Sequence, residues 1–199
     1  MNYLKNSDDF CVKSYYVLGY RVQNGVIYVY YPNRTTCIGY SKENEKNLLY
    51  LMKSQIEEAY EEIPRLKKSK SNNLFWYYYN LCFAGLNTYI GLGINGSIKG
   101  LNLFLAGLFI ILNRISASKL YKDSEFIKEI NKYMYFLNYE DEINSEIIKK
   151  YQEENENSLF YNPDDAPVIT INDIHDTTIQ ELKETVELIR KNNNNNNKL

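Results

Sequence analysis

The sequence predicts a mainly helical α+β protein: a small N-terminal β-hairpin or sheet, a helical membrane hairpin in the middle and a helical C-terminal region. Three observations predict this class. Two β-rich runs meet at Asn24-Gly25, apolar residues recur at helical spacing beyond Ser41, and residues 74–113 carry one formal charge, Lys99. The mean hydropathy of -0.48 therefore averages over two unlike parts of the chain.

Composition excludes several classes of protein. Aromatic residues make up 15% of the chain, and 20 of them are Tyr, which excludes a fully disordered chain. Three Cys without a CxxC pair do not form a disulfide scaffold. A net charge of -2 argues against a nucleic-acid partner. The polar first ten residues predict no cleavable signal peptide.

Residues 1–64 are expected to form one unit, a β-hairpin with a covering helix. Strands over 12–22 and 26–31 flank Asn24-Gly25, and this dipeptide favours the type I′ turn of a two-residue hairpin. A short third strand is expected over 35–40. Ser41 is the expected N-cap of the helix, and Pro64 is expected to end it. The apolar positions of this helix are Leu48, Leu49, Leu51, Met52, Ile56, Ala59, Tyr60 and Ile63.

A basic linker, 65–73, precedes a hydrophobic helical hairpin over 74–113. A helix needs about 20 mainly apolar residues to span a bilayer, so this stretch predicts two transmembrane helices, 75–94 and 97–115. The turn is expected at 95–100, around Asn95-Gly96. The first span is the weaker of the two because Asn80 and Asn87 dilute it. A single span with a partly embedded first segment is an alternative.

The residues that flank this stretch support a membrane interpretation. Four basic residues lie in 65–70, three lie in 114–122, and only Lys99 lies in the turn, so the positive-inside rule predicts that both termini are cytoplasmic. The basic linker also suits attraction to anionic headgroups. Gly96, Gly100 and Gly107 are expected to allow close helix packing. The expected membrane-interface residues are Arg65, Lys67, Lys68, Lys70, Trp76, Tyr77, Lys99 and Arg114.

Residues 114–152 predict a helical region, with a new helix capped by Asp123 or Ser124. Residues 153–191 predict a short strand over 168–171 and an amphipathic helix, which the capping box Thr178-x-x-Glu181 opens. The Asn-rich tail, 192–199, is expected to be disordered. The apolar stripe of the last helix either packs on the protein's own body or docks a protein partner; its residues are Ile179, Leu182, Val186 and Ile189.

Motifs for chemistry are weak. Gly91-x-Gly93-x-x-Gly96 matches a dinucleotide fingerprint, but no buried strand precedes it, so we interpret these glycines as turn and packing residues. The sequence predicts no cofactor and no catalytic residue. Asp173, His175 and Asp176 are weak metal-ligand candidates, because a lone His without a second helical ligand is more typical of polar residues near a helix start.

The sequence therefore predicts a membrane-anchored adaptor or scaffold whose partners are the lipid bilayer and a soluble protein. A soluble α+β interaction module with 74–113 as buried helices is the main alternative. A small metal-dependent or membrane-embedded enzyme and a pore are weaker ones. Homo-oligomer formation is compatible with each of these hypotheses.

Overall fold

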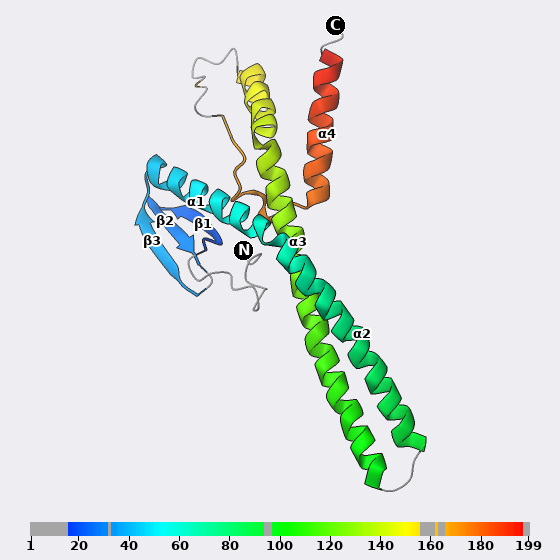
Figure 1. Cartoon of the computed structure of the whole chain (residues 1–199). Helices are drawn as coiled ribbons and strands as arrows, with labels where there is room; N and C mark the ends of the chain where they lie inside the picture. The colour runs from blue at the N-terminus through cyan, green and yellow to red at the C-terminus, as the bar shows by residue number, and fades with distance from the viewer. Residues whose placement is uncertain (1–15, 32, 94–96, 156–161, 163–165, 197–199) are drawn as a thin grey trace. The chain divides into compact units, whose positions relative to one another are not determined.

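The computed structural model describes residues 16–31, 33–93, 97–155, 162 and 166–196. It is 77% helical, with a small antiparallel sheet followed by helices, which confirms the predicted α+β class (Figure 1). The chain divides into two units. The first combines residues 16–60 with 129–196, and the second is Glu61–Lys128. We call them the α+β unit and the hairpin unit and describe each by itself.

The sheet of the α+β unit contains β1 (Gly19–Gln23), β2 (Val26–Tyr30) and β3 (Thr35–Gly39) in the order β1-β2-β3. Gln23 pairs with Val26 across the first turn. Asn24 and Gly25 both have positive φ, 52° and 72°, as a type I′ turn requires. The predicted hairpin is thus confirmed. The predicted strand residues 12–15 lie outside the described part of the chain.

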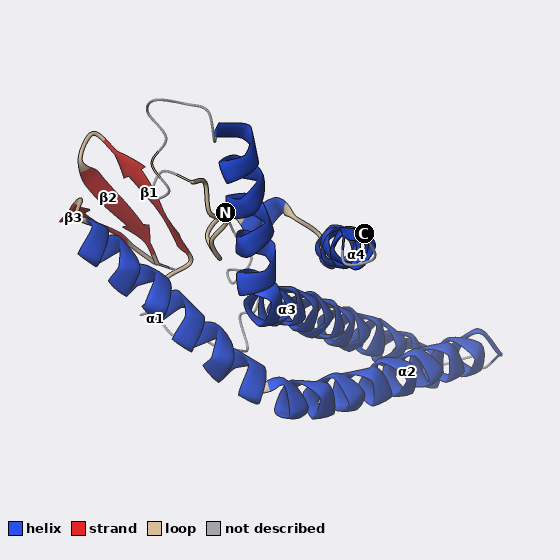
Figure 2. Cartoon of the chain, turned by 90° about the horizontal axis from the view of Figure 1, so that it is seen from above, coloured by secondary structure: helices blue, strands red, loops and turns tan. Residues whose placement is uncertain are grey.

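Helix α1 (Lys42–Glu61) covers one face of this sheet (Figure 2). The Asn44 N–H donates to Ser41 Oγ at 3.0 Å, so Ser41 is the N-cap that the sequence predicts. Strand alternation turns Ile27 and Val29 toward the core, where Met52 of α1 is also buried. The predicted helix ends close to Pro64, as expected, but Pro64 itself lies in the first turn of the next helix.

The core of the α+β unit also contains residues from the C-terminal part of α3 (Ser97–Asn155) and from α4 (Ile179–Asn196). Tyr133 and Phe136 of α3 are fully buried in it. Three residues of α4 close the core, namely Leu182, Val186 and Ile189. Arg190 of α4 binds Glu142 of α3 through two hydrogen bonds, of 3.0 and 3.2 Å. These contacts fix α4 to the last part of α3 in this unit.

The segment 167–173 of the α+β unit is held by side-chain amides rather than by a sheet. The Asn144 amide exchanges two hydrogen bonds with the backbone of Ile169, at 2.8 and 3.0 Å. Asn172 does the same with Tyr20 of β1, at 3.1 and 3.2 Å. The predicted strand over 168–171 is therefore wrong, because the backbone of Ile169 pairs with the Asn144 side chain and the Thr170 N–H donates to the Asp173 carboxylate. A 3₁₀-helix, η2 (Ile174–Asp176), follows.

The capping box at the start of α4 is confirmed. The Thr178 N–H donates to Glu181 Oε2 at 2.7 Å, and the Glu181 N–H donates to Thr178 Oγ1 at 3.2 Å. The predicted disordered tail is wrong for Asn192–Asn196, which extend α4. Elongating a helix that the core already anchors needs no new nucleation, so even Asn residues can continue it. Residues 197–199 lie outside the described part of the chain.

This capping box predicts a pH-dependent helix start. The Thr178 N–H holds the pKa of Glu181 below its usual value because it stabilises the ionised carboxylate. The stabilisation is therefore complete above the pKa of the unfolded chain and is lost as the pH falls through the lowered pKa of the folded state. We expect the exchange protection of first-turn amides in α4 to fall in that acidic range. A Glu181→Gln variant should keep the box and lose the pH dependence, whereas equal pH profiles would contradict this assignment.

The hairpin unit consists of α2 (Ile63–Gly93) and the first part of α3, which lie side by side in both views (Figures 1 and 2). Two predictions are wrong here. The linker 65–73 belongs to α2, and no new helix starts at Asp123 or Ser124, because α3 runs unbroken over 59 residues. Residues 65–84 and 114–152 contain no Gly or Pro, so no helix-breaking residue lies at the expected linker or around Asp123.

Candidate membrane hairpin and cleft of the α+β unit

The two helices of the hairpin unit are antiparallel neighbours. The rings of Phe83 and Phe109 lie 5.5 Å apart between centroids. Nearer the turn, Gly91 lies against Leu103. These contacts define the register of the two helices: a residue of α2 lies level with the residue of α3 for which the two residue numbers add up to about 193.

Small side chains line the contact between these helices. Ala84 of α2 and Ala106 of α3 are almost fully buried, with exposed fractions of 5% and 4%. A Cβ atom added to Gly91 would lie 3.0 Å from the Leu103 side chain. Small residues that let helices approach closely are typical of membrane helix pairs.

The predicted packing glycines do not take part in this contact. An added Cβ at Gly100 or Gly107 would meet nothing within 4 Å. Successive helix positions turn by about 100°, so Gly107 lies well away from the face that Ala106 buries. The prediction is therefore wrong for these two glycines, and Gly96 lies outside the described residues.

Polar side chains in the apolar part of the hairpin mostly bond to their own helix. Asn87 donates to the Phe83 carbonyl at 2.8 Å, and Asn102 donates to the Ile98 carbonyl at 3.0 Å. Such bonds to the preceding turn satisfy donors without a partner helix. Asn80 is buried, and the register places it level with Asn113, whose Oδ1 is buried without a hydrogen-bond partner among the described residues.

The outward surface of the hairpin is apolar on both helices. The best 18-residue window of α3 has a mean hydropathy of 1.6, and only 6% of it is buried. By length and composition, α3 is the one described helix that could cross a membrane. The exposed large apolar residues between the two basic flanks include Phe75, Trp76, Leu81, Leu86, Leu92, Leu101, Phe104, Leu108, Ile110 and Ile111.

The predicted interface residues lie at the two ends of this apolar surface. Arg65, Lys67 and Lys68 are exposed at the open end of the hairpin, and Lys70 donates to Ser124 Oγ at 3.2 Å. Trp76 and Tyr77 follow within two turns, and Arg114 is exposed on α3. Lys99 is half-buried in the first turn of α3. The basic and aromatic residues among them thus lie toward the open end of the hairpin, and Lys99 alone lies at the other end.

The fit at Gly91 gives a testable prediction. Gly91→Leu forces a side chain into the Leu103 contact, which is expected to cost about 1–3 kcal/mol of helix packing. Spin labels on Cys82 and on an Ile111→Cys variant, with the other cysteines replaced by Ser, should then report a broader and longer distance distribution. Gly93→Leu is the matched control, because an added Cβ there meets nothing within 4 Å. Equal distributions in both variants would contradict the contact.

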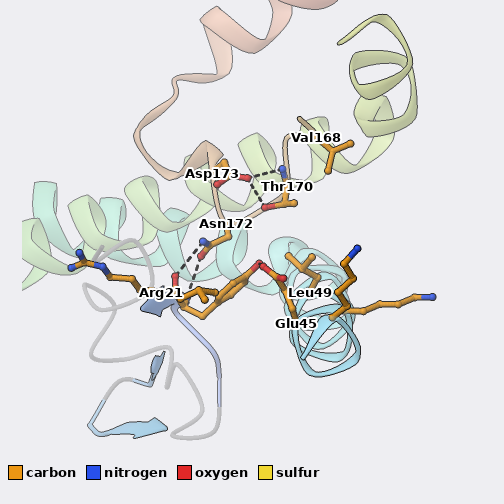
Figure 3. A pocket seen from close by; sticks show the side chains of 11 residues that line it. Arg21, Glu45, Leu49, Val168, Thr170, Asn172 and Asp173 are labelled. Carbon is orange, nitrogen blue, oxygen red and sulfur yellow. Dashed lines mark hydrogen bonds between the residues drawn. The ribbon is translucent and has the colours of Figure 1, made fainter. Parts of the chain in front are cut away.

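The α+β unit contains a solvent-open cleft of about 580 Å³ (Figure 3). Its walls are the outer edge of β1, the first turns of α1 and the segment 168–173. Asn172 covers this edge at Tyr20, while Val22 and Val168 are exposed. Sequence analysis did not find this cleft, because the pairing of Asn172 with Tyr20 joins positions 152 residues apart.

Both carboxylates of the cleft are engaged in internal hydrogen bonds. The Tyr20 hydroxyl donates to Glu45 Oε1 at 3.0 Å, and burial together with this carboxylate raises the pKa of Tyr20 well above its usual value. Asp173 Oδ2 accepts from both the N–H and the hydroxyl of Thr170, at 2.9 and 2.6 Å. The hydroxyls of Tyr20 and Thr170 and the two carboxylates of the cleft are thus engaged with one another.

The metal-ligand candidates do not converge on one point. Asp173 is engaged with Thr170, and His175 Nε2 lies 3.0 Å from Asp176 Oδ1. No group of three or more His, Cys, Asp or Glu side chains that could hold a metal ion occurs among the described residues. Gly91 and Gly93 lie in the last turn of α2 and follow no strand, so the dinucleotide interpretation also has no structural support.

The docking stripe of the last helix is largely inaccessible. Leu182, Val186 and Ile189 are buried in the core of the α+β unit, and only Ile179 is exposed. A partner could reach these three side chains only if α4 left the unit. The structure therefore favours the interpretation that the stripe packs on the protein's own body.

Comparison with known proteins adds no functional information. No family model matches the chain, and no curated protein or solved structure matches it significantly.

Proposed function

We propose that the chain is a membrane-anchored adaptor, with the hairpin unit inserted in a bilayer and the α+β unit in the cytoplasm as a protein-binding module. The single observation that carries the anchor is the outward apolar surface of the hairpin. In water, such a surface would be far larger than the apolar patches of soluble monomers. In a bilayer, the hydrocarbon chains of the lipids cover this apolar surface.

The internal structure of the hairpin supports the same proposal. The residues buried between its helices include the small Ala84, Gly91 and Ala106, while most of the large apolar side chains of the unit are exposed. Water drives large apolar residues inside a soluble helix pair, whereas lipid does not, and membrane pairs close on small residues instead. The exposure of large apolar side chains on the surface of the hairpin therefore favours lipid as the surrounding medium.

Charge counts support the orientation. Four basic residues in 65–70 and three in 114–122 flank the apolar surface, against Lys99 alone near the turn. On the positive-inside rule this places both ends of the hairpin on the cytoplasmic side. The adaptor role rests on the α+β unit, which has its own core and an open cleft for a partner.

One observation favours a second candidate. The apolar helix α2 does not reach the hydropathy that α3 reaches among the described helices. A soluble α+β module whose hairpins pack against one another in an oligomer would tolerate the more polar α2. The two candidates differ in whether lipid or protein covers the outward residues.

Two native cysteines test the anchor. Cys37 of β3 and Cys82 of α2 are both exposed on the protein itself. In membranes from cells that express a Cys11→Ser variant, a charged maleimide should label Cys37 rapidly and Cys82 only after detergent is added. The reason is that a thiol surrounded by lipid neither ionises nor meets the reagent.

The same preparation gives the contradicting outcomes. Carbonate extraction should leave the protein in the pellet. Recovery in the supernatant as a discrete oligomer would support the soluble candidate, and labelling of Cys82 at the rate of Cys37 in intact membranes would also contradict the anchor.

A further inference from the structure

The open end of the hairpin concentrates positive charge on its outside. Residues 61–128 contain nine basic and four acidic side chains. Apart from Lys99, Arg114 and Lys128, the basic ones gather around the level where residues 69–70 meet residues 123–124. We call these the basic collar; its members are Arg65, Lys67, Lys68, Lys70, Lys119 and Lys122.

The acidic groups of this unit are mostly turned inward or paired. Asp123 is buried, and its Oδ2 accepts from Ser69 Oγ at 3.3 Å and from Asn73 Nδ2 at 3.2 Å. Glu62 lies 3.6 Å from Arg65, and Glu125 lies 2.7 Å from Lys128. The bonds of Asp123 thus join the two helices and keep a negative charge away from the collar surface.

Two lysines of α2 are available to a ligand outside the protein. Lys67 and Lys68 are exposed, and they form no ion pair with any described residue. Towards the turn, the apolar surface begins within about one helical turn of Lys70, at Leu74 and Phe75. Basic residues next to an apolar surface match a phospholipid, whose phosphate headgroup lies next to its hydrocarbon chains.

From this arrangement we propose that the basic collar binds the headgroups of anionic phospholipids in the leaflet through which the hairpin enters the bilayer. The inference rests on the proposed membrane anchor and names its lipid partner. The contribution expected of each juxtamembrane Lys or Arg is about fivefold in lipid affinity, and it falls as salt screens the charges. Lys99 alone cannot provide a comparable site at the opposite leaflet.

Trp76 provides the readout, because it is the single Trp of the chain and lies two turns beyond Lys68. The full chain is reconstituted into phosphatidylcholine vesicles that contain either dansyl-phosphatidylserine or dansyl-phosphatidylcholine as a trace lipid. Energy transfer from Trp76 should be stronger to the serine lipid, and high salt should reduce the difference. In Lys67→Gln/Lys68→Gln the preference should fall at least about fivefold.

The control is Lys42→Gln/Lys46→Gln, which removes the same charge from exposed positions of α1 and should leave the preference unchanged. If energy transfer to the two lipids is equal and the protein floats with the vesicles, headgroup binding by the basic collar is contradicted, while the proposed membrane anchor is not. Failure to float with any vesicle, and no transfer to either lipid, would overturn the anchor itself.

Discussion

Replacing two residues in the middle of the hairpin with Arg is expected to abolish membrane integration. Phe104 and Leu108 lie four residues apart on α3, near the centre of the predicted span, and both are exposed on the protein surface. If lipid surrounds them, replacing both with Arg costs about 3 kcal/mol each on insertion scales. We expect carbonate extraction to move Phe104→Arg/Leu108→Arg from the pellet largely into the supernatant.

The matched control places the same charges on the α+β unit. Tyr50 and Ser54 are also four residues apart and exposed, on α1. Tyr50→Arg/Ser54→Arg should remain in the pellet like the parent protein. If both double variants distribute alike, the outward face of α3 does not contact lipid.

The largest expected effect on folding comes from Phe136. Its side chain is fully buried in the core of the α+β unit. Phe136→Ala removes this buried ring and leaves a cavity, so the unit should lose about 3–5 kcal/mol of stability. Hydrogen exchange of the β2 amides should accelerate by the corresponding factor, since these amides open with the core.

Leu188→Ala is the control for this effect, because Leu188 of α4 is 60% exposed. It should change the same exchange rates by less than about 0.5 kcal/mol in equivalent free energy. A Phe136→Ala variant that retains parental exchange rates would contradict the packing described for the core.

The elements predicted correctly are those with a local cause. The type I′ turn follows from Asn24-Gly25, the α1 N-cap from Ser41, and the capping box from Thr178 and Glu181. In each case the residues that bond are within a few positions of one another. These features can therefore be predicted from the local sequence.

The errors concern choices that distant contacts decide. Asn144 binds the backbone of Ile169, and the Asn172 side chain binds the backbone of Tyr20 in β1; the local sequence around Val168 does not reveal either of these distant pairings. Likewise, Asn73 and Ser69 bind Asp123, which holds α2 and α3 together where polar sequence predicted a linker and a new helix start. The basic charge of 65–70 is visible in the sequence, but the inward turn of Asp123 is not.

The hairpin interface shows the same limit. Small residues at Gly100 and Gly107 looked as suitable as those at Ala84 and Gly91, because spacing alone does not reveal which face meets the other helix. Only the register, fixed by contacts such as Phe83 with Phe109, separates the two sets.

The unpaired amide oxygen of Asn113 has a mechanical consequence. A hydrogen bond to it would have fixed the angle of rotation of α3 about its own axis, and no described residue supplies that bond. In the apolar part of the hairpin, steric fit at Ala106 and Gly91 sets this angle instead, whereas the directional hydrogen bonds of Asp123 act only at the open end. Asn113→Leu should consequently leave the spin-label distances of the hairpin unchanged and raise its thermal stability, whereas Gly91→Leu changes both. Away from the Asp123 hydrogen bonds, the apolar part of the hairpin is then aligned by shape, and its helices can turn slightly there without breaking a bond between them.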